Sequence, residues 1–197
     1  VISCGSKKTF ELLDASYTGI TFSNDVKDND TLNILRQEYL YNGGGVGMGD
    51  FNKDGLQDLF FAGNIVESKL YLNKGELKFE DVTSKANLDT KKRWCSGVAV
   101  VDINADGLLD IYVCNAGYQK GINTKNDLYI NKGNNHFVES ASSYGLDEDG
   151  YTTHAAFFDY DHDGDLDLFL LNNSFKAIGS FNLQKNERNI RDSLGGH

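Results

Sequence analysis

The sequence predicts an all-β fold built from repeated four-stranded units, and three observations lead to this prediction. The chain of 197 residues has 21 glycines and no proline, which is typical of a fold with many tight turns. Aromatic residues make up 12% and gather in short segments of the kind that favour strands. An aspartate-rich loop recurs three times. No segment shows a sustained 3.6-residue apolar period, and helical turns are expected only within 31–41 and 174–192.

Internal repetition is the strongest organisational signal. Residues 70–75 read Leu-Tyr-Leu-Asn-Lys-Gly and residues 128–133 read Leu-Tyr-Ile-Asn-Lys-Gly, each followed four residues later by a phenylalanine. The acidic loops begin at Asp50, Asp102 and Asp159, at spacings of 52 and 57 residues. A period of about 50 residues is close to that of β-propeller blades.

Each repeat divides into four short strands bounded by Gly and Asn. The first strand enters the acidic loop (45–49, 97–101, 155–158) and the second leaves it (59–62, 109–114, 168–171). The third is the Leu-Tyr-x-Asn element, and the fourth lies at 79–83 or 137–140. We therefore predict blade 1 at about 43–88, blade 2 at about 95–146 and an incomplete blade 3 at about 153–197.

Residues 10–20 match the fourth strand of a repeat, with no earlier strand before them. A closed propeller often completes its last blade with a strand from the chain start, which removes an exposed edge. We therefore expect residues 10–197 to form a partial β-propeller with two complete blades, one incomplete blade and one strand of the closing blade. We expect the rest of the propeller to lie outside this sequence. We also expect the isolated fragment to be unstable or to associate non-specifically.

The chain is acidic, with a net charge of −10, and has no basic patch, which argues against DNA or RNA as a partner. No apolar run approaches the ~18 residues that span a membrane.

Three cysteines are too few for a disulfide scaffold. Cys95 and Cys114 lie at unequal offsets from the second loop, which favours two buried thiols over a pair. Val1-Ile2-Ser3-Cys4 resembles the end of a bacterial lipoprotein signal, and an ordinary terminal cysteine is the alternative. We read 1–9 as a signal remnant and tether. The expected location is outside the cytoplasm, as an outer-membrane or cell-surface lipoprotein or a secreted protein, with membrane contact only through a lipid on Cys4.

The three loops share the pattern Asp-x-Asx-x-Asp-Gly-x-x-Asp, which predicts up to three Ca²⁺ ions. Calcium takes six to eight oxygen ligands in a forgiving geometry. Positions one, three, five and nine supply side-chain oxygens and position seven a backbone carbonyl, so the Asp165 side chain is expected to point outward. The glycine at position six permits a sharp turn. The predicted ligands are Asp50, Asn52, Asp54, Leu56 and Asp58; Asp102, Asn104, Asp106, Leu108 and Asp110; and Asp159, Asp161, Asp163, Asp165 and Asp167.

An EF-hand would need a glutamate at position twelve, and that position holds Phe61, Val113 and Leu170. Plain Asp-Gly turns without an ion are the alternative, and three matching copies favour the ion. Asn at the third position is expected to weaken the first two sites.

These residues resemble the FG-GAP/VCBS repeat family, whose calcium loops also occur in integrin α-subunit propellers. Residues 10–20, 43–50, 70–75 and 79–83 are similar in particular to the N-terminal half of ASPIC/UnbV-type (cartilage acidic protein-like) propellers. The resemblance implies a propeller of about seven blades, secretion or surface display, and a binding role.

We expect a calcium-binding scaffold for a protein or glycan ligand, with no catalytic residues. The alternative is a fragment of a secreted polysaccharide-degrading, lyase-like propeller enzyme, for which Tyr151, His154, Arg93 and Trp94 are the few candidates. A purely structural role in a larger surface assembly also remains open.

Overall fold

The computed structural model describes residues 10–30, 32–35, 40–91, 93–116 and 121–173. The predicted lipid site at Cys4 and the helical turn within 174–192 lie outside these residues, as does part of 31–41. The described helices are α1 (Ala15–Thr18) and α2 (Ala141–Tyr144), and neither is long and apolar enough to span a membrane.

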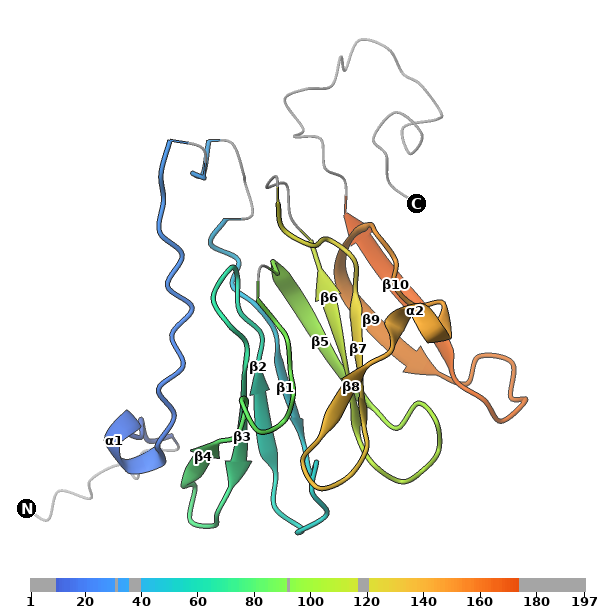
Figure 1. The fold of residues 1–197 in the computed structure, drawn as a ribbon, viewed down its shortest axis with the longest axis horizontal. Coiled ribbons are helices and arrows are strands. Elements are labelled where there is room, and N and C mark those ends of the chain that lie inside the picture. Colours follow the sequence, from blue (N-terminus) through green and yellow to red (C-terminus); the bar gives the residue numbers. More distant parts are fainter. Residues whose placement is uncertain (1–9, 31, 36–39, 92, 117–120, 174–197) are drawn as a thin grey trace, which may run out of the picture.

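Three antiparallel sheets make up the described chain (Figure 1). The first runs in the order β1 (Val46–Gly49), β2 (Asp58–Phe61), β3 (Lys69–Asn73) and β4 (Phe79–Asp81). The second repeats it with β5 (Cys95–Val101), β6 (Asp110–Asn115), β7 (Asp127–Asn131) and β8 (Phe137–Glu139). The third is the hairpin β9 (Tyr151–Phe158) and β10 (Asp167–Asn173). The all-β prediction is confirmed, and the four-stranded meanders are consistent with propeller blades.

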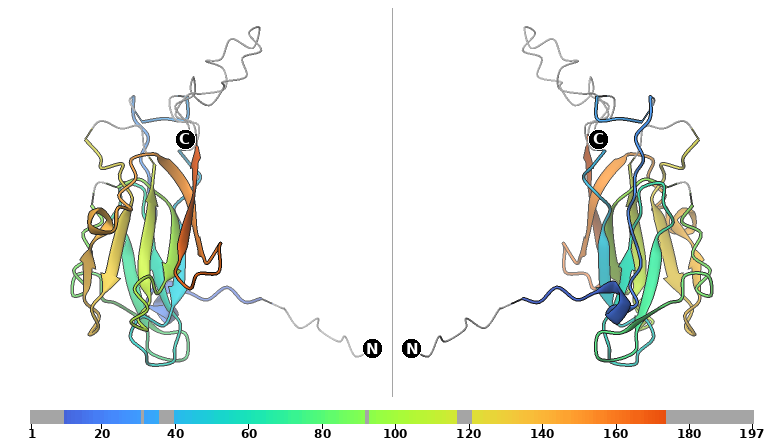
Figure 2. Two further views of the ribbon diagram at one scale, coloured as in Figure 1. Left: turned by 90° about the vertical axis from the view of Figure 1, so that its right-hand side faces the viewer. Right: turned by 90° about the vertical axis from the view of Figure 1, so that its left-hand side faces the viewer.

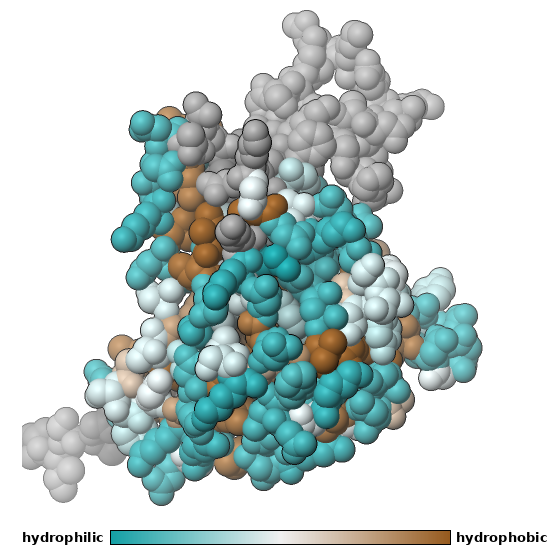
Figure 3. Space-filling view, viewed as in Figure 1, coloured by the Kyte–Doolittle hydropathy of each residue, from teal (hydrophilic) through white to brown (hydrophobic). Residues whose placement is uncertain are grey.

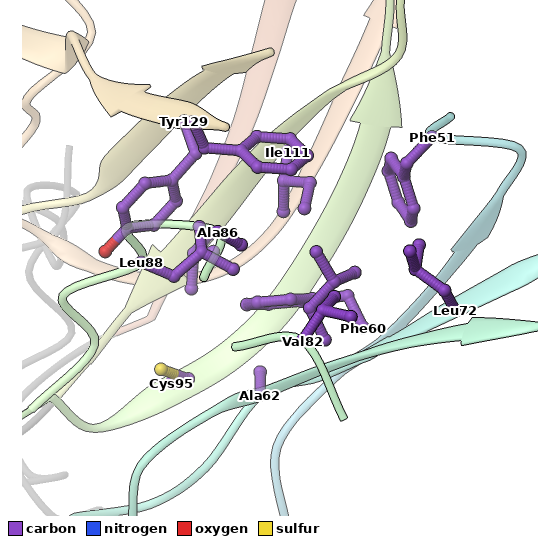
Figure 4. Close-up of a cluster of buried hydrophobic side chains, with 13 residues drawn as sticks. Phe51, Phe60, Ala62, Leu72, Val82, Ala86, Leu88, Cys95, Ile111 and Tyr129 are labelled. Carbon is purple, nitrogen blue, oxygen red and sulfur yellow. The ribbon is translucent and has the colours of Figure 1, made fainter. Parts of the chain in front are cut away.

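The hydrophobic core lies between the sheets. Between the first and second sheets, Phe60 and Leu72 meet Ile111 and Tyr129 (Figure 4). A second cluster joins the second sheet to the third. The second sheet is covered on both faces, so every residue of β6 and β7 is buried. In β10, exposed and half-buried residues alternate, because the described chain covers one face only.

Glycines let the first strands of neighbouring sheets approach closely. A Cβ atom at Gly47 of β1 would lie 2.8 Å from Cγ1 of Val98 in β5. A Cβ atom at Gly97 of β5 would lie 2.6 Å from the carbonyl oxygen of Thr153 in β9. Since no side chain fits at these positions, the glycines set the spacing at which one sheet packs on the next.

The predicted strand within 10–20 is wrong. Residues 15–18 form α1, which the Asp14 side chain caps at its start, and residues 10–30 contain no strand. A fourth strand needs the backbone groups of a third strand beside it, and the described residues offer none to 10–14. Phe10 and Leu12 are 89% and 98% exposed, and Figure 2 shows this segment leading away from the sheets.

The residues after α1 nevertheless pack as the end of a repeat. The backbone N–H of Thr21 donates to the Tyr71 hydroxyl at 3.3 Å, and the Phe22 ring stacks on Phe61. In the second sheet the equivalent tyrosine, Tyr129, donates its hydroxyl to the Asp89 carbonyl, in the segment that follows the first sheet. Residues 19–22 therefore take, on the first sheet, the place that the end of the first repeat takes on the second.

Cys95 and Cys114 are free thiols. Cys95 belongs to the cluster facing the first sheet and Cys114 to the cluster facing the third. The two side chains therefore lie on opposite faces of the second sheet, which agrees with two buried thiols.

Candidate metal centre

The three acidic loops join β1 to β2, β5 to β6 and β9 to β10. They lie at the same end of the sheets, toward the lower and right-hand side of Figure 1. The antiparallel register brings the strand ends together at each loop, as in the pairing of Gly49 with Asp58 and of Val101 with Asp110. The sheets thus present three equivalent loops on one side of the molecule.

Each loop turns twice through the left-handed region. The glycine at position six does so in all three loops, with φ of 85°, 82° and 95° at Gly55, Gly107 and Gly164. Position four does so as well, at Lys53, Ala105 and His162, with φ of 60°, 56° and 64°. The sequence predicted the turn at position six and missed the one at position four. None of the residue types at position four favours positive φ strongly enough to indicate a turn. His162 is exposed.

In the first loop, side-chain oxygens converge on one backbone N–H. The N–H of Asp54 donates to Oδ1 of Asp50 at 3.1 Å and to Oδ1 of Asn52 at 2.9 Å. The Asn52 amide in turn donates to Oδ2 of Asp54 at 2.9 Å. The side chains of positions one, three and five therefore surround a common centre.

The second loop repeats this geometry. The N–H of Asp106 donates to Asp102 and Asn104 at 3.1 and 3.0 Å, and the Asn104 amide donates to Asp106 at 3.0 Å. In both loops an amide N–H thus offsets part of the negative charge of the fifth-position carboxylate.

The ninth-position aspartate ties the loop to the third strand of its sheet. Oδ2 of Asp58 accepts the N–H of Phe51 at 3.0 Å, and Oδ1 accepts the N–H of Asn73 in β3 at 2.8 Å. Asp110 makes the same two bonds, to Ile103 and Asn131. Both carboxyl groups are buried, and this burial raises their pKa values. Sequence reasoning assigned these residues only to a metal; the asparagine that ends both Leu-Tyr-x-Asn elements was the available signal for their structural role.

The third loop differs because its third position is a carboxylate. Oxygens of Asp159, Asp161 and Asp167 lie within 4.8 Å of one another, the one such acidic group among the described residues. Oδ1 of Asp159 is buried and has no hydrogen-bond partner in the described chain. No asparagine amide offsets the charge here, so the third loop has the strongest need for a cation.

Asp163 and Asp165 complete the third loop. The backbone N–H of Asp165 donates to Oδ1 of Asp163 at 3.1 Å, and this bond lowers the pKa of Asp163. The pKa of Asp165 is raised by its hydrogen bond to the carboxyl group of Asp163 and by the charge of that neighbour. The Asp165 side chain is exposed, as expected, but it lies against Asp163.

The loop chemistry fits a hard divalent cation. The converging side chains offer oxygen atoms only, and Ca²⁺ and Mg²⁺ prefer oxygen ligands. The unpartnered Asp159 oxygen in the third loop is the observation that favours an ion over plain turns.

In the first two loops the second position faces the next sheet. Phe51 is 1% exposed and its ring meets that of Phe137 in β8 edge-on, at 6.1 Å between centroids. The Asn131 amide of β7 donates to the Phe51 carbonyl at 2.8 Å. Ile103 packs in the cluster between the second and third sheets, whereas Tyr160 is 75% exposed. The loops therefore also contribute to packing between sheets.

Three of the residues considered for catalysis have different environments from one another. Both guanidinium edge nitrogens of Arg93 bind the Asp127 carboxylate, at 2.7 and 2.9 Å. Trp94 is buried in a cluster with Leu32 and Leu40. His154 is exposed on β9.

A comparison with protein families finds the FG-GAP-like repeat at residues 50–113 and 116–170, together more than half of the chain. No curated protein matches the chain. The narrower resemblance to ASPIC/UnbV-type propellers stays a prediction. The matched segments begin at or between the acidic loops and run through the strands described above, and the chain belongs to the FG-GAP-like repeat family.

Proposed function

We propose that this chain is part of an exported, calcium-stabilised propeller scaffold that binds a protein or glycan and has no catalytic activity of its own. The observation that carries the proposal is the third loop, where three carboxylates converge and one buried oxygen of Asp159 lacks a partner. The family and the blade-like sheets support the scaffold role. Export rests on the lipoprotein-like sequence at Cys4.

Each loop would hold one Ca²⁺ ion, bound jointly by the residues at positions one, three, five, seven and nine. The ion would offset carboxylate repulsion that otherwise opposes the folded loop. Because the ligands converge only when the loop is folded, ion binding and loop order are coupled. The Phe51 contacts extend this coupling to the interface between the first two sheets.

Thermal melts of the chain in EDTA, in excess Ca²⁺ and in excess Mg²⁺ test the proposal. A ligand that binds only the folded state at a hundred times its dissociation constant adds ~2.7 kcal/mol per site. We expect a large rise in melting temperature with Ca²⁺ and a smaller one with Mg²⁺, which demands a stricter octahedral geometry. A cooperative melt that is the same in all three conditions would reduce the loops to plain turns.

Two reciprocal variants connect the metal to individual loops. Asp161→Asn gives the third loop the asparagine of the first two, and Asn52→Asp gives the first loop the carboxylate of the third. We expect weaker Ca²⁺ binding for the first variant and tighter binding for the second, measured by competition with a fluorescent chelator. Urea unfolding in EDTA is the control for folding. Equal affinities in all three proteins would contradict the assigned ligands.

A further inference from the structure

We propose that the described residues on the two sides of one hollow, Asn24–Lys27 and Leu40, Tyr41 and Gly43, form a carbohydrate-binding site at the end of the sheets opposite the acidic loops. The proposal rests on the scaffold function above and names the class of ligand and its place. The described residues of this segment lie at the upper left of Figure 1, whereas the acidic loops lie toward its lower and right-hand side.

The segment is an insertion relative to the other repeats. The connection from Leu88 to Cys95 leads directly from the first sheet to the second, and the connection from Leu146 to Tyr151 leads from the second to the third. The equivalent connection before the first sheet runs from Ile20 to Val46 and is several times longer. Connections longer than about 12–15 residues are uncommon in compact domains and often carry function.

The insertion is fixed to the scaffold. Asn24 and Asn64 exchange two hydrogen bonds, of 2.6 and 2.8 Å, which join the insertion to the segment between β2 and β3. Leu32 and Leu40 are buried against Trp94, which precedes β5. A loop attached in this way to two sheets can hold binding groups in defined positions.

The insertion lines a hollow of about 610 Å³. This volume lies within the range of small-ligand sites, roughly 300–1,000 Å³. Its lining includes the charged Asp25 and Lys27 and the apolar side chains of Leu40 and Tyr41. Figure 3 shows apolar surface in the same upper-left region, bordered by hydrophilic side chains.

The lining chemistry matches a sugar. Tyr41 is 60% exposed, and its hydroxyl donates to Oδ2 of Asp28 at 2.6 Å, so the ring is held at the surface in a fixed orientation. Asp25 and Lys27 are exposed and make no hydrogen bond or ion pair among the described residues. A held aromatic ring offers a flat apolar face to the C–H groups of a sugar ring. The flanking carboxylate and ammonium can make charge-assisted bonds to its hydroxyl groups.

Other classes of ligand fit less well. A peptide that binds by adding a strand needs an exposed sheet edge, and this lining comes from a loop. A nucleic acid needs several cations along its backbone, and the described lining of this hollow contains one lysine and one aspartate, in a chain of net charge −10.

The test titrates the full chain, in excess Ca²⁺, with tetrasaccharides of β-1,4-linked glucose, mannose and xylose and of α-1,4-linked galacturonic acid. Binding is followed by calorimetry and by saturation-transfer NMR. We expect at least one tetrasaccharide to bind, and Tyr41→Ala to weaken it about tenfold or more, as for a central aromatic contact. Tyr41→Phe keeps the ring but loses the hydroxyl bond to Asp28, so it should weaken binding less than Tyr41→Ala does.

Tyr17→Ala is the matched control. Tyr17 is 48% exposed and donates its hydroxyl to the Glu76 carbonyl, and it lies in α1 at the other end of the molecule. Its substitution should leave sugar binding unchanged. Absence of binding to all four tetrasaccharides, or binding that Tyr41→Ala leaves unaltered, would overturn the proposal.

The outcome is separable from that of the calcium proposal. Sugar binding that depends on Tyr41 in a chain whose melt ignores Ca²⁺ would support this site and refute the metal sites. A chain that Ca²⁺ stabilises but that binds no tetrasaccharide would support the metal sites and refute the sugar site.

Discussion

Replacing Phe51 with alanine tests whether the first acidic loop helps to join the first two sheets. The Phe51 side chain is 1% exposed and packs in the shared core against Phe137. Removing a buried phenylalanine side chain costs about 3–5 kcal/mol, because the apolar contacts are lost and a cavity remains. The backbone carbonyl that accepts from Asn131 is retained, so the variant isolates the contribution of the ring.

The matched control is Tyr160→Ala, at the same position of the third loop. Tyr160 is 75% exposed, so its loss should change the free energy of unfolding by no more than about 0.5 kcal/mol. Neither position belongs to the predicted ligand set. Both variants are compared with the parent by urea unfolding, in EDTA and in Ca²⁺. A cost for Phe51→Ala below about 1 kcal/mol, or no larger than that of the control, would refute the role of the Phe51 ring in joining the first two sheets.

Two further predictions concern buried groups of the second sheet. Arg93→Met leaves the Asp127 carboxylate buried without its bidentate partner and should cost about 3–5 kcal/mol at pH 7. Burial raises the pKa of Asp127 and Arg93 lowers it, so without Arg93 the buried carboxyl group takes up a proton more readily, and the loss should shrink as the pH falls from 8 to 5. An equal loss in urea unfolding at both pH values would contradict this. Burial raises the pKa of Cys95 and of Cys114 to about 12, so in a Cys4→Ser variant a disulfide reagent at pH 8 should label these thiols only on unfolding. Complete labelling of the native chain within the mixing time would show that they are accessible.

In the acidic loops, the sequence predicted the chemistry of the side chains but only part of the backbone conformation. Asp-Gly at positions five and six indicated a turn between two strands, because glycine adopts positive φ without steric cost. The second turn at position four falls on Lys53, Ala105 and His162, and no residue preference reveals it. It follows from closing the loop around its own N–H groups.

The N-terminal segment shows the limit of matching one repeat to another. Residues 10–20 resemble the end of a repeat, and the packing of Thr21 and Phe22 on the first sheet agrees with that match. The strand itself did not form, because a strand is defined by hydrogen bonds to a neighbour rather than by its own sequence. Without a third strand beside it, the same pattern leaves Phe10 and Leu12 exposed.

The sequence by itself determined the repeat, the hairpins and the oxygen-rich loops, because these depend on residues close together along the chain. Only the tertiary structure decided how the sheets meet. Gly97 sets the approach of β5 to β9, and Phe51 belongs to the core of the neighbouring sheet. The ninth-position aspartate is likewise committed to a third-strand N–H as well as to the loop. These roles depend on contacts between residues distant in sequence, and such contacts exist only once the sheets have packed.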